Sequence, residues 1–131
     1  MSNKIILYET LDGNCSVADF LKGLPTKHHA KALRNLELLE EFGQHLQGGF
    51  ITHIRGNIWE LRISFAGDIS RILYFIPDGK TIILLHGFIK KKQKTPNKEI
   101  EIALKRMKEY LGRSNSHENT TRTHKRADEK S

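Results

Sequence analysis

The chain has 131 residues, of which 37% are hydrophobic, and this size favours a single domain with one modest core. No apolar run approaches the roughly 18 residues of a membrane span, and the start resembles no signal peptide, so we expect a cytoplasmic protein without membrane contact. The single cysteine, Cys15, excludes an internal disulfide. The net charge of +7 suggests an anionic partner, with nucleic acid as the first candidate.

The positive charge is concentrated in the second part of the chain. Residues 1–50 contain five Lys or Arg and six Asp or Glu, whereas residues 51–131 contain seventeen and nine. The segment after Gly112 contributes only five of these cations and three of these anions. Most of the excess therefore belongs to the part that we expect to fold, although solubility plus a basic tail is an alternative explanation.

The predicted elements begin with a short apolar strand at residues 4–10. A short helix follows at 16–24 and a longer one at 26–43, and we expect the two to pair as a helical hairpin. The longer helix keeps a period of about 3.6, which predicts one face toward the core, at Ala30, Leu33, Leu36 or Glu37, and Leu39 or Glu40. His28 and His29 are expected to be exposed and without function.

The period then changes to two, which predicts strands. Four segments carry it: FITHIR (50–55), IWELRISF (58–65), ISRILYFI (69–76) and TIILLHGFIK (81–90). Turn-forming residues join each segment to the next, so we expect an antiparallel meander. A last helix is predicted over residues 95–112, with Thr95 as its N-cap and Gly112 at its end.

This order of elements predicts an α+β fold. The expected architecture is a small, mainly antiparallel sheet with the helical hairpin on one face and a C-terminal helix. Residues 1–112 form the expected domain. Residues 113–131 contain no large apolar side chain and no period, so we expect a disordered, basic and polar tail.

Alternation along the strands assigns side chains to the two faces of the sheet. One set from residues 58–65 is expected to cover the hairpin: Trp59, Leu61, Ile63 and Phe65. Glu60 and Arg62 point the opposite way, and Arg71 joins them if Ile72 packs inward. Pairing across strands explains Glu60 and Arg62 equally well. Arg71 is harder to explain by packing, because burying an unpaired charge between apolar neighbours is costly.

Lysines gather where the last strand meets the last helix: Lys90, Lys91, Lys92 and Lys94. Together with Arg62 and Arg71 they form a set that can grip a phosphate backbone, and the N-terminus of the helix adds free N–H groups. A solvated edge that discourages strand pairing is the alternative. His86 is expected to be a packed or hydrogen-bonded histidine more often than a catalyst. No second ligand accompanies it at metal spacing, so no metal or cofactor is expected.

Four strings carry a resemblance to a known family: W-E-L-R-I at 59–63, S-R-I-L-Y-F at 70–75, L-L-H-G-F-I-K-K at 84–91 and K-T-P-x-x-E-I at 94–100. Together they make residues 4–111 similar to the HigB-like, phage-derived branch of the RelE/ParE superfamily of bacterial toxins. The resemblance implies a RelE-like sheet that carries a helical hairpin on one face and a concave basic site on the other.

The resemblance also implies a function, that of the toxin in a type II toxin–antitoxin system. Such a toxin is a ribosome-dependent mRNA endonuclease that inhibits translation and growth until a helix-turn-helix antitoxin neutralises it in a hetero-oligomer. Cleavage without metal needs a group that takes the 2′-hydroxyl proton, cations that stabilise the phosphorane, and an acid for the 5′-oxygen. Arg71 matches the family's arginine on the middle strand and is the first candidate for phosphate stabilisation.

Other positions are candidates for the remaining roles in the implied reaction. Arg62 is the second candidate for phosphate stabilisation, and Lys91 and Lys94 are candidates for phosphate binding or proton transfer. The general base stays open among three side chains: Tyr110, His86 and Glu60. Two other functions are alternatives, a ParE-like inhibitor of DNA gyrase that cuts nothing and a non-catalytic basic module that binds RNA or ribosomes. The W-E-L-R-I and H-G-F-I-K-K strings favour cleavage over gyrase binding.

Overall fold

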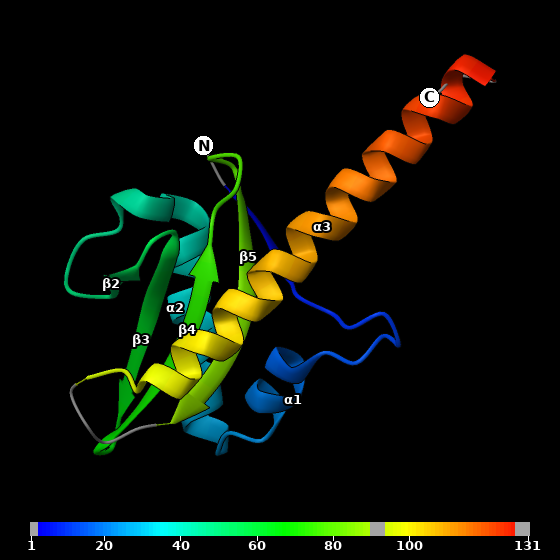
Figure 1. The fold of residues 1–131 in the computed structure, drawn as a ribbon. Coiled ribbons are helices and arrows are strands. Elements are labelled where there is room, and N and C mark those ends of the chain that lie inside the picture. Colours follow the sequence, from blue (N-terminus) through cyan, green and yellow to red (C-terminus); the bar gives the residue numbers. More distant parts are fainter. Residues whose placement is uncertain (1–2, 90–93, 128–131) are drawn as a thin grey trace.

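A computed structural model describes residues 3–89 and 94–127 of the chain, with side chains as far as Arg113. The elements follow in this order: β1 (Lys4–Leu7), α1 (Ser16–Lys22), α2 (Thr26–Phe42), the short 3-10 helix η1 (Gly43–His45), β2 (Ile51–Arg55), β3 (Ile58–Phe65), β4 (Asp68–Phe75), β5 (Thr81–Ile89) and α3 (Asn97–Ala127). The sequence of helices and strands is the one predicted, and Figure 1 shows how they are arranged.

The strands form one sheet in the order β1-β5-β4-β3-β2. β2 to β5 run antiparallel to their neighbours, and β1 joins β5 as the parallel pair among the described strands. The turn between β3 and β4 has positive φ at both central residues, 52° at Ala66 and 87° at Gly67, as a tight hairpin between twisted strands requires. The predicted meander and the mainly antiparallel α+β fold are confirmed.

Helices cover both faces of the sheet, with α1 and α2 on one and α3 across the other (Figure 1). We call these the hairpin face and the α3 face. The core of the hairpin face combines helix and strand residues, among them Val17, Leu21, Leu36, Leu39, Leu61, Ile63, Ile72 and Leu84. The core of the α3 face is separate and includes Ile58, Leu73, Phe75, Ile83, Leu85 and Ala103. The predicted assignment of β3 and β4 side chains to the two faces is confirmed.

The buried side of α2 differs from the prediction. Five of its residues are buried: His28, Ala32, Asn35, Leu36 and Leu39. Ala30 and Leu33, which the helical period assigned to the core, are exposed instead. His28 was expected to be exposed, but it is buried with its Nε2 2.6 Å from Ser70 Oγ. Asn35 donates to a β3 carbonyl at 3.2 Å. The helix is rotated from the predicted orientation because polar residues find partners in the core.

α3 continues to Ala127, so the predicted helix end at Gly112 is wrong. A glycine costs a helix interior only roughly 0.5–1 kcal/mol relative to alanine. The residue after it offsets that cost, since Arg113 donates to the Glu9 carbonyl at 2.7 Å and to the Tyr8 hydroxyl at 3.0 Å. The division of the chain at residue 112 into a domain and a tail stays a prediction. No helix in the described part of the chain, α3 included, is both long and apolar enough to cross a membrane.

Candidate active site

A buried polar cluster lies on the α3 face. It joins Glu60 of β3, Arg71 of β4 and Thr95, which precedes α3. Arg71 Nη1 lies 3.5 Å from Glu60 Oε2 and donates to Thr95 Oγ1 at 3.2 Å, while the Thr95 hydroxyl donates to Glu60 Oε2. Arg71 is 1% exposed and Glu60 is 2% exposed. The Glu60–Arg71–Thr95 cluster therefore fastens the start of α3 to the middle of the sheet.

Two expectations about this region were wrong. Arg71 was expected on an open face of the sheet, but the start of α3 covers it, and the cost of burying its charge is offset by the carboxylate beside it. Thr95 was expected to cap the helix, but its hydroxyl binds Glu60. The first turn of α3 is closed instead by the Pro96 carbonyl, which accepts from the amides of Glu99 and Ile100 at 3.1 and 3.3 Å.

Arg62 stands opposite Arg71 in the register of β3 and β4. Two guanidinium groups in directly opposed positions repel each other, and Arg71 is the one held by Glu60. Arg62 is half-buried, and its Nε is buried without a hydrogen-bond partner among the described residues. Because part of its side chain is accessible, Arg62 can meet an anion that enters from solvent. Arg62 is therefore the more accessible of the two arginines that the sequence analysis selected.

His86 connects β5 to α3. The register between β4 and β5 shifts at this point, and the resulting bulge directs both Leu85 and His86 toward the α3 face. His86 Nε2 lies 2.6 Å from Glu99 Oε1. On the other side of the ring, Arg106 Nη1 lies 3.4 Å from Nδ1 and donates to the Leu85 carbonyl at 2.8 Å. Both ring nitrogens are engaged, so this is the hydrogen-bonded histidine that the sequence analysis favoured, and a catalytic role for it stays a prediction.

Tyr8, which directly follows β1, forms a further polar contact with α3. Its hydroxyl donates to the Glu109 carboxylate, and the guanidinium carbons of Arg106 and Arg113 lie 5.8 and 5.1 Å from the centre of its ring. Burial and then the Glu109 carboxylate raise the pKa of Tyr8, so its hydroxyl keeps its proton. None of these residues was among the predicted site residues. The sequence signal that could have indicated them is the spacing of Arg106, Glu109 and Arg113, which places all three on one side of a helix.

A comparison with protein families gives a match over residues 19–108 to a family described as phage derived protein Gp49-like (DUF891). The chain belongs to this family. The matched segment contains β3, β4, β5 and the start of α3, and with them every described residue of the Glu60–Arg71–Thr95 cluster. The resemblance to the HigB-like, phage-derived branch of the RelE/ParE superfamily is thereby confirmed.

Two curated relatives of this Gp49-like chain are 44% identical to it over 63 residues. Each is named "Probable endoribonuclease HigB1", and they come from Mycobacterium tuberculosis strains CDC 1551 / Oshkosh and ATCC 25618 / H37Rv. The matched segment is 48% of this chain and 50% of each relative. The chain thus spans about half the length of the curated relatives that it matches.

No hydrogen bond or ion pair among the described residues of the Gp49-like chain joins Lys94 or Tyr110 to the cluster. Lys94 is exposed, whereas Lys90, Lys91 and Lys92 lie outside the described residues. Tyr110 packs edge-on against Phe75, with ring centres 6.1 Å apart. It lies about 20 Å along α3 from the first turn at 1.5 Å per residue. The structure therefore leaves Glu60 and His86 nearer to the two arginines than Tyr110.

The described side chains of this Gp49-like chain offer three kinds of chemistry near the start of α3. Arg62 and Arg71 can stabilise an anion, the Glu60 carboxylate can accept a proton, and the Thr95 hydroxyl can donate one. Within the two described ranges, no group of three or more His, Cys, Asp or Glu side chains is placed to hold a metal ion. The arrangement is suited to a substrate with a phosphodiester.

Proposed function

We propose that the chain is the toxin of a type II toxin–antitoxin system and acts in the cytoplasm as a ribosome-dependent mRNA endonuclease. The observation that carries this proposal is the 44% identity over 63 residues to the protein named probable endoribonuclease HigB1. The net charge of +7 supports RNA as the substrate, and so do Arg62 and Arg71, which stand opposite each other on β3 and β4. Cleavage would inhibit translation and growth until a helix-turn-helix antitoxin bound the toxin in a hetero-oligomer.

The proposed reaction is the attack of the RNA 2′-hydroxyl on the adjacent phosphate. The 2′-oxygen bonds to phosphorus as the base takes its proton, and the bond to the 5′-oxygen breaks as that oxygen gains a proton. The products are a 2′,3′-cyclic phosphate and a 5′-hydroxyl end. Arg62 and Arg71 would stabilise the phosphorane, Lys91 and Lys94 would bind phosphate or transfer a proton, and Glu60 or His86 would act as the base.

Burial suggests an order among these groups. Arg62 is half-buried whereas Arg71 is 1% exposed, so Arg62 would meet the phosphate first. Arg71 and Glu60 lie beneath Thr95, and RNA would reach them only if the start of α3 were displaced. Arg62 is accordingly the residue whose loss should affect cleavage most with the least effect on the fold.

Mapping of 5′-hydroxyl transcript ends after brief induction tests the proposal. We expect cuts within translated messages for the wild type and loss of these cuts for Arg62→Ala at an unchanged melting temperature. Arg34→Ala, which removes an exposed arginine of α2, is the matched control and should cleave normally. Gyrase-linked DNA breaks with intact transcripts would favour the ParE-like alternative. Ribosome binding by the wild type without either kind of damage would favour a non-catalytic module.

The lysines around residue 92 are tested by a salt titration of ribosome binding. Each phosphate contact to a single strand contributes about −0.7 to the slope of log K against log salt. Replacing Lys90, Lys91, Lys92 and Lys94 together by Gln would remove two to four contacts and flatten the slope by roughly 1.5–3. An identical slope would mean that the lysines only protect a sheet edge.

The antitoxin is tested independently of the cleavage chemistry. A small helix-turn-helix protein encoded beside the gene for this chain should restore growth when both are expressed, and the two should purify as one complex. Rescue without a complex, or a complex without rescue, would contradict neutralisation by direct binding.

A further inference from the structure

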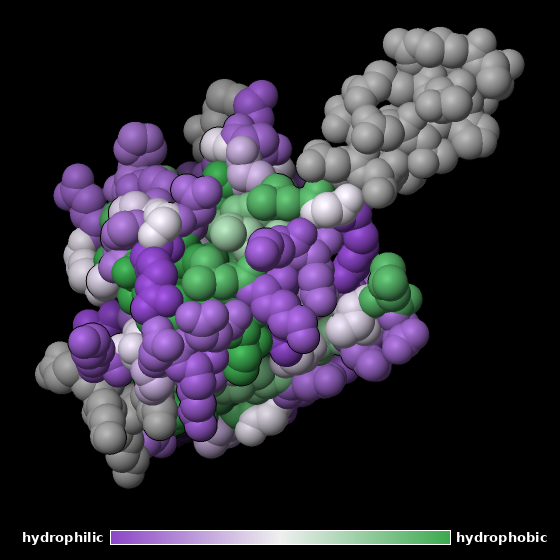
Figure 2. All heavy atoms as spheres, viewed as in Figure 1, coloured by the Kyte–Doolittle hydropathy of each residue, from purple (hydrophilic) through white to green (hydrophobic). Residues whose placement is uncertain are grey.

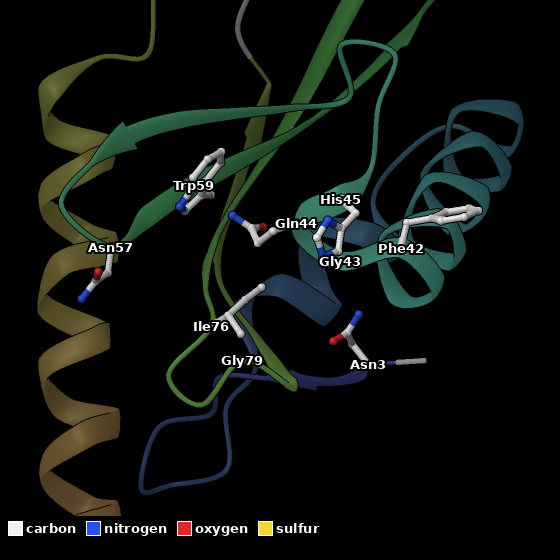
Figure 3. A pocket seen from close by; sticks show the side chains of 9 residues that line it. All are labelled: Asn3, Phe42, Gly43, Gln44, His45, Asn57, Trp59, Ile76 and Gly79. Carbon is white, nitrogen blue, oxygen red and sulfur yellow. The ribbon is translucent and has the colours of Figure 1, made fainter. Parts of the chain in front are cut away.

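A pocket of about 250 Å³ lies where the end of α2 and η1 meet the β2–β3 and β4–β5 turns (Figure 3). Trp59 forms part of its wall and packs on the hairpin face of the sheet. Its neighbour along β3, Glu60, points to the α3 face. The pocket is therefore separate from the Glu60–Arg71–Thr95 cluster, although both use the same strand.

The described side chains that line the pocket are polar or apolar but not acidic, and none is Lys or Arg. The polar side chains of the lining are Asn3, Gln44, His45 and Asn57. Trp59 supplies a flat aromatic surface, supported by the His53 ring with centres 5.1 Å apart. A flat ring surrounded by neutral donors and acceptors suits a planar, uncharged heterocycle better than a phosphate or a carboxylate.

Two features fix the polar groups of this pocket. The hydroxyl of Tyr74 donates to Gln44 Oε1 at 2.8 Å, and burial raises the pKa of Tyr74, so the bond persists at neutral pH. With its oxygen held, the Gln44 amide nitrogen points toward Trp59 (Figure 3). Gly43 has φ +55°, and a Cβ there would lie 2.6 Å from the Asn3 amide nitrogen. Gly43 therefore leaves room for the Asn3 amide, whose nitrogen donates to the Glu40 carbonyl at 3.3 Å.

We propose that this pocket binds a single nucleobase, stacked on Trp59 and hydrogen-bonded at its edge by Gln44 and Asn3. Proteins that recognise unpaired bases use this combination of aromatic stacking and edge contacts. The volume is below the roughly 300–1,000 Å³ of pockets for drug-sized ligands, which fits one base without its sugar. The site lies on the opposite face from the proposed cleavage and does not depend on it.

The surroundings of the pocket predict weak discrimination by charge. Exposed residues that adjoin the lining in the sequence carry charges of both signs: Lys4 and Lys80 are positive, and Glu41 and Asp78 are negative. A phosphate attached to the base therefore gains little attraction there. A nucleoside and its 5′-monophosphate should bind with similar affinity.

The fluorescence of Trp59 tests the proposal, because Trp59 is the only tryptophan of the chain. The full-length protein is titrated separately with adenosine, guanosine, cytidine and uridine, with excitation where the nucleosides do not absorb. We expect a saturable change in emission with at least one nucleoside and none with ribose. The absence of a saturable change with all four nucleosides would overturn the proposal.

Variants then assign the binding to this pocket. Gln44→Ala should raise the dissociation constant by about threefold to tenfold, equivalent to about 0.6–1.4 kcal/mol. Gln47→Ala is the matched control and should leave the dissociation constant unchanged. Gln47 is exposed, follows η1 and lies outside the lining. If Gln44→Ala does not fold, Asn3→Ala takes its place. A folded lining variant that binds as well as the wild type would overturn the assignment.

A single-stranded 2′-O-methyl oligoribonucleotide identifies the source of the base. Its lack of a free 2′-hydroxyl prevents the proposed cleavage, so this result is independent of whether the chain cuts RNA. Binding that is tighter than that of the nucleoside and weaker in Gln44→Ala would assign the pocket to a base within an RNA strand. Binding no tighter than that of the 5′-monophosphate would assign it to a free nucleotide.

Discussion

β3 and β4 send alternate side chains to the two faces of the sheet, and the two sets differ in kind. On the hairpin face, Leu61, Ile63 and Ile72 are fully buried against α1 and α2. On the α3 face, the same strands present Glu60 and Arg71, which are buried as well but are held by polar contacts. Viewed from this side, α3 presents hydrophilic side chains outward, and apolar patches show between it and the strands (Figure 2).

The two faces of the sheet should differ in how they tolerate substitution of their side chains. Apolar packing is non-directional, so many arrangements of similar volume bury the same area. A buried polar cluster stabilises only when every partner is present, because one missing partner leaves the others desolvated and unpaired. We therefore expect the hairpin face to respond gradually to substitution. The α3 face should depend on a few contacts, chiefly Arg71 with Glu60 and His86 with Glu99.

Arg71→Ala should produce the largest effect, because it leaves the Glu60 carboxylate buried without its cation. Removing one partner of a buried ion pair typically costs about 3–5 kcal/mol, a large share of the stability of a small domain. Urea unfolding measures the loss. Arg62→Ala removes the half-buried arginine opposite Arg71 and should cost much less. Equal losses in the two variants would show that the Glu60–Arg71–Thr95 cluster is not what holds the α3 face.

A double variant separates the stability of this cluster from its chemistry. Glu60→Leu with Arg71→Met removes both charges, and apolar replacements of buried pairs are often neutral or stabilising. The free energy of unfolding should therefore return close to the wild-type value. A stable double variant that no longer cuts transcripts would assign the pair to the proposed reaction, whereas undiminished cutting would remove it from the mechanism.

Gly87→Ala probes the hairpin face and should have the next largest effect. A Cβ at Gly87 would lie 2.5 Å from the Phe20 ring of α1, so that helix would have to shift. Overpacking of this kind costs about 1–3 kcal/mol. Gly112→Ala is the matched control, because nothing lies within 4 Å of its Cβ position and alanine favours the helix by roughly 0.5–1 kcal/mol. Thermal melts that rank the two variants the other way would contradict the packing on this face.

Two truncations test the far end of the α3 face, with a smaller expected effect. Removing residues 114–131 leaves Arg113 in place and should change the melting temperature little, because that segment has no large apolar side chain. Removing residues 113–131 also deletes the bonds of Arg113 to Glu9 and Tyr8 and should cost about 1 kcal/mol more. Identical melts for the two truncated proteins would show that Arg113 does not fasten α3 to the segment after β1.

Asp78 lies in the β4–β5 turn, outside both packed faces, and should give the smallest effect. The backbone amides of Lys80 and Thr81 donate to its carboxylate at 2.9 and 2.7 Å and lower the pKa of Asp78. A carboxyl with a lowered folded pKa stabilises the fold above its unfolded value of about 3.9, and this contribution is lost as the pH falls through the folded pKa. The difference in melting temperature between wild type and Asp78→Ala should therefore shrink with acidification. A difference that widens would contradict this assignment.

The sequence by itself determined the features that local geometry controls. A period of two along β3 and β4 assigned Leu61 and Ile72 to one face and Glu60 and Arg71 to the other, because a strand alternates its side chains whatever covers them. Turn glycines such as Gly56, Gly67 and Gly79 determined the hairpin connections, because few other residues adopt a positive φ readily. Short strings such as W-E-L-R-I were sufficient to indicate the family that the comparison confirmed.

Only the tertiary structure decided which of these side chains are paired, covered or accessible. Whether Arg71 lies open or buried depends on Thr95, which arrives from a later part of the chain. The bulge that aims His86 at Glu99 exists only when β5 pairs with β4. Just past Gly112 in α3, Arg113 meets Tyr8, which directly follows β1. Each outcome depends on a partner far away in the sequence. A local period cannot reveal it, because the free energy of a buried charge is set by the group that folding brings beside it.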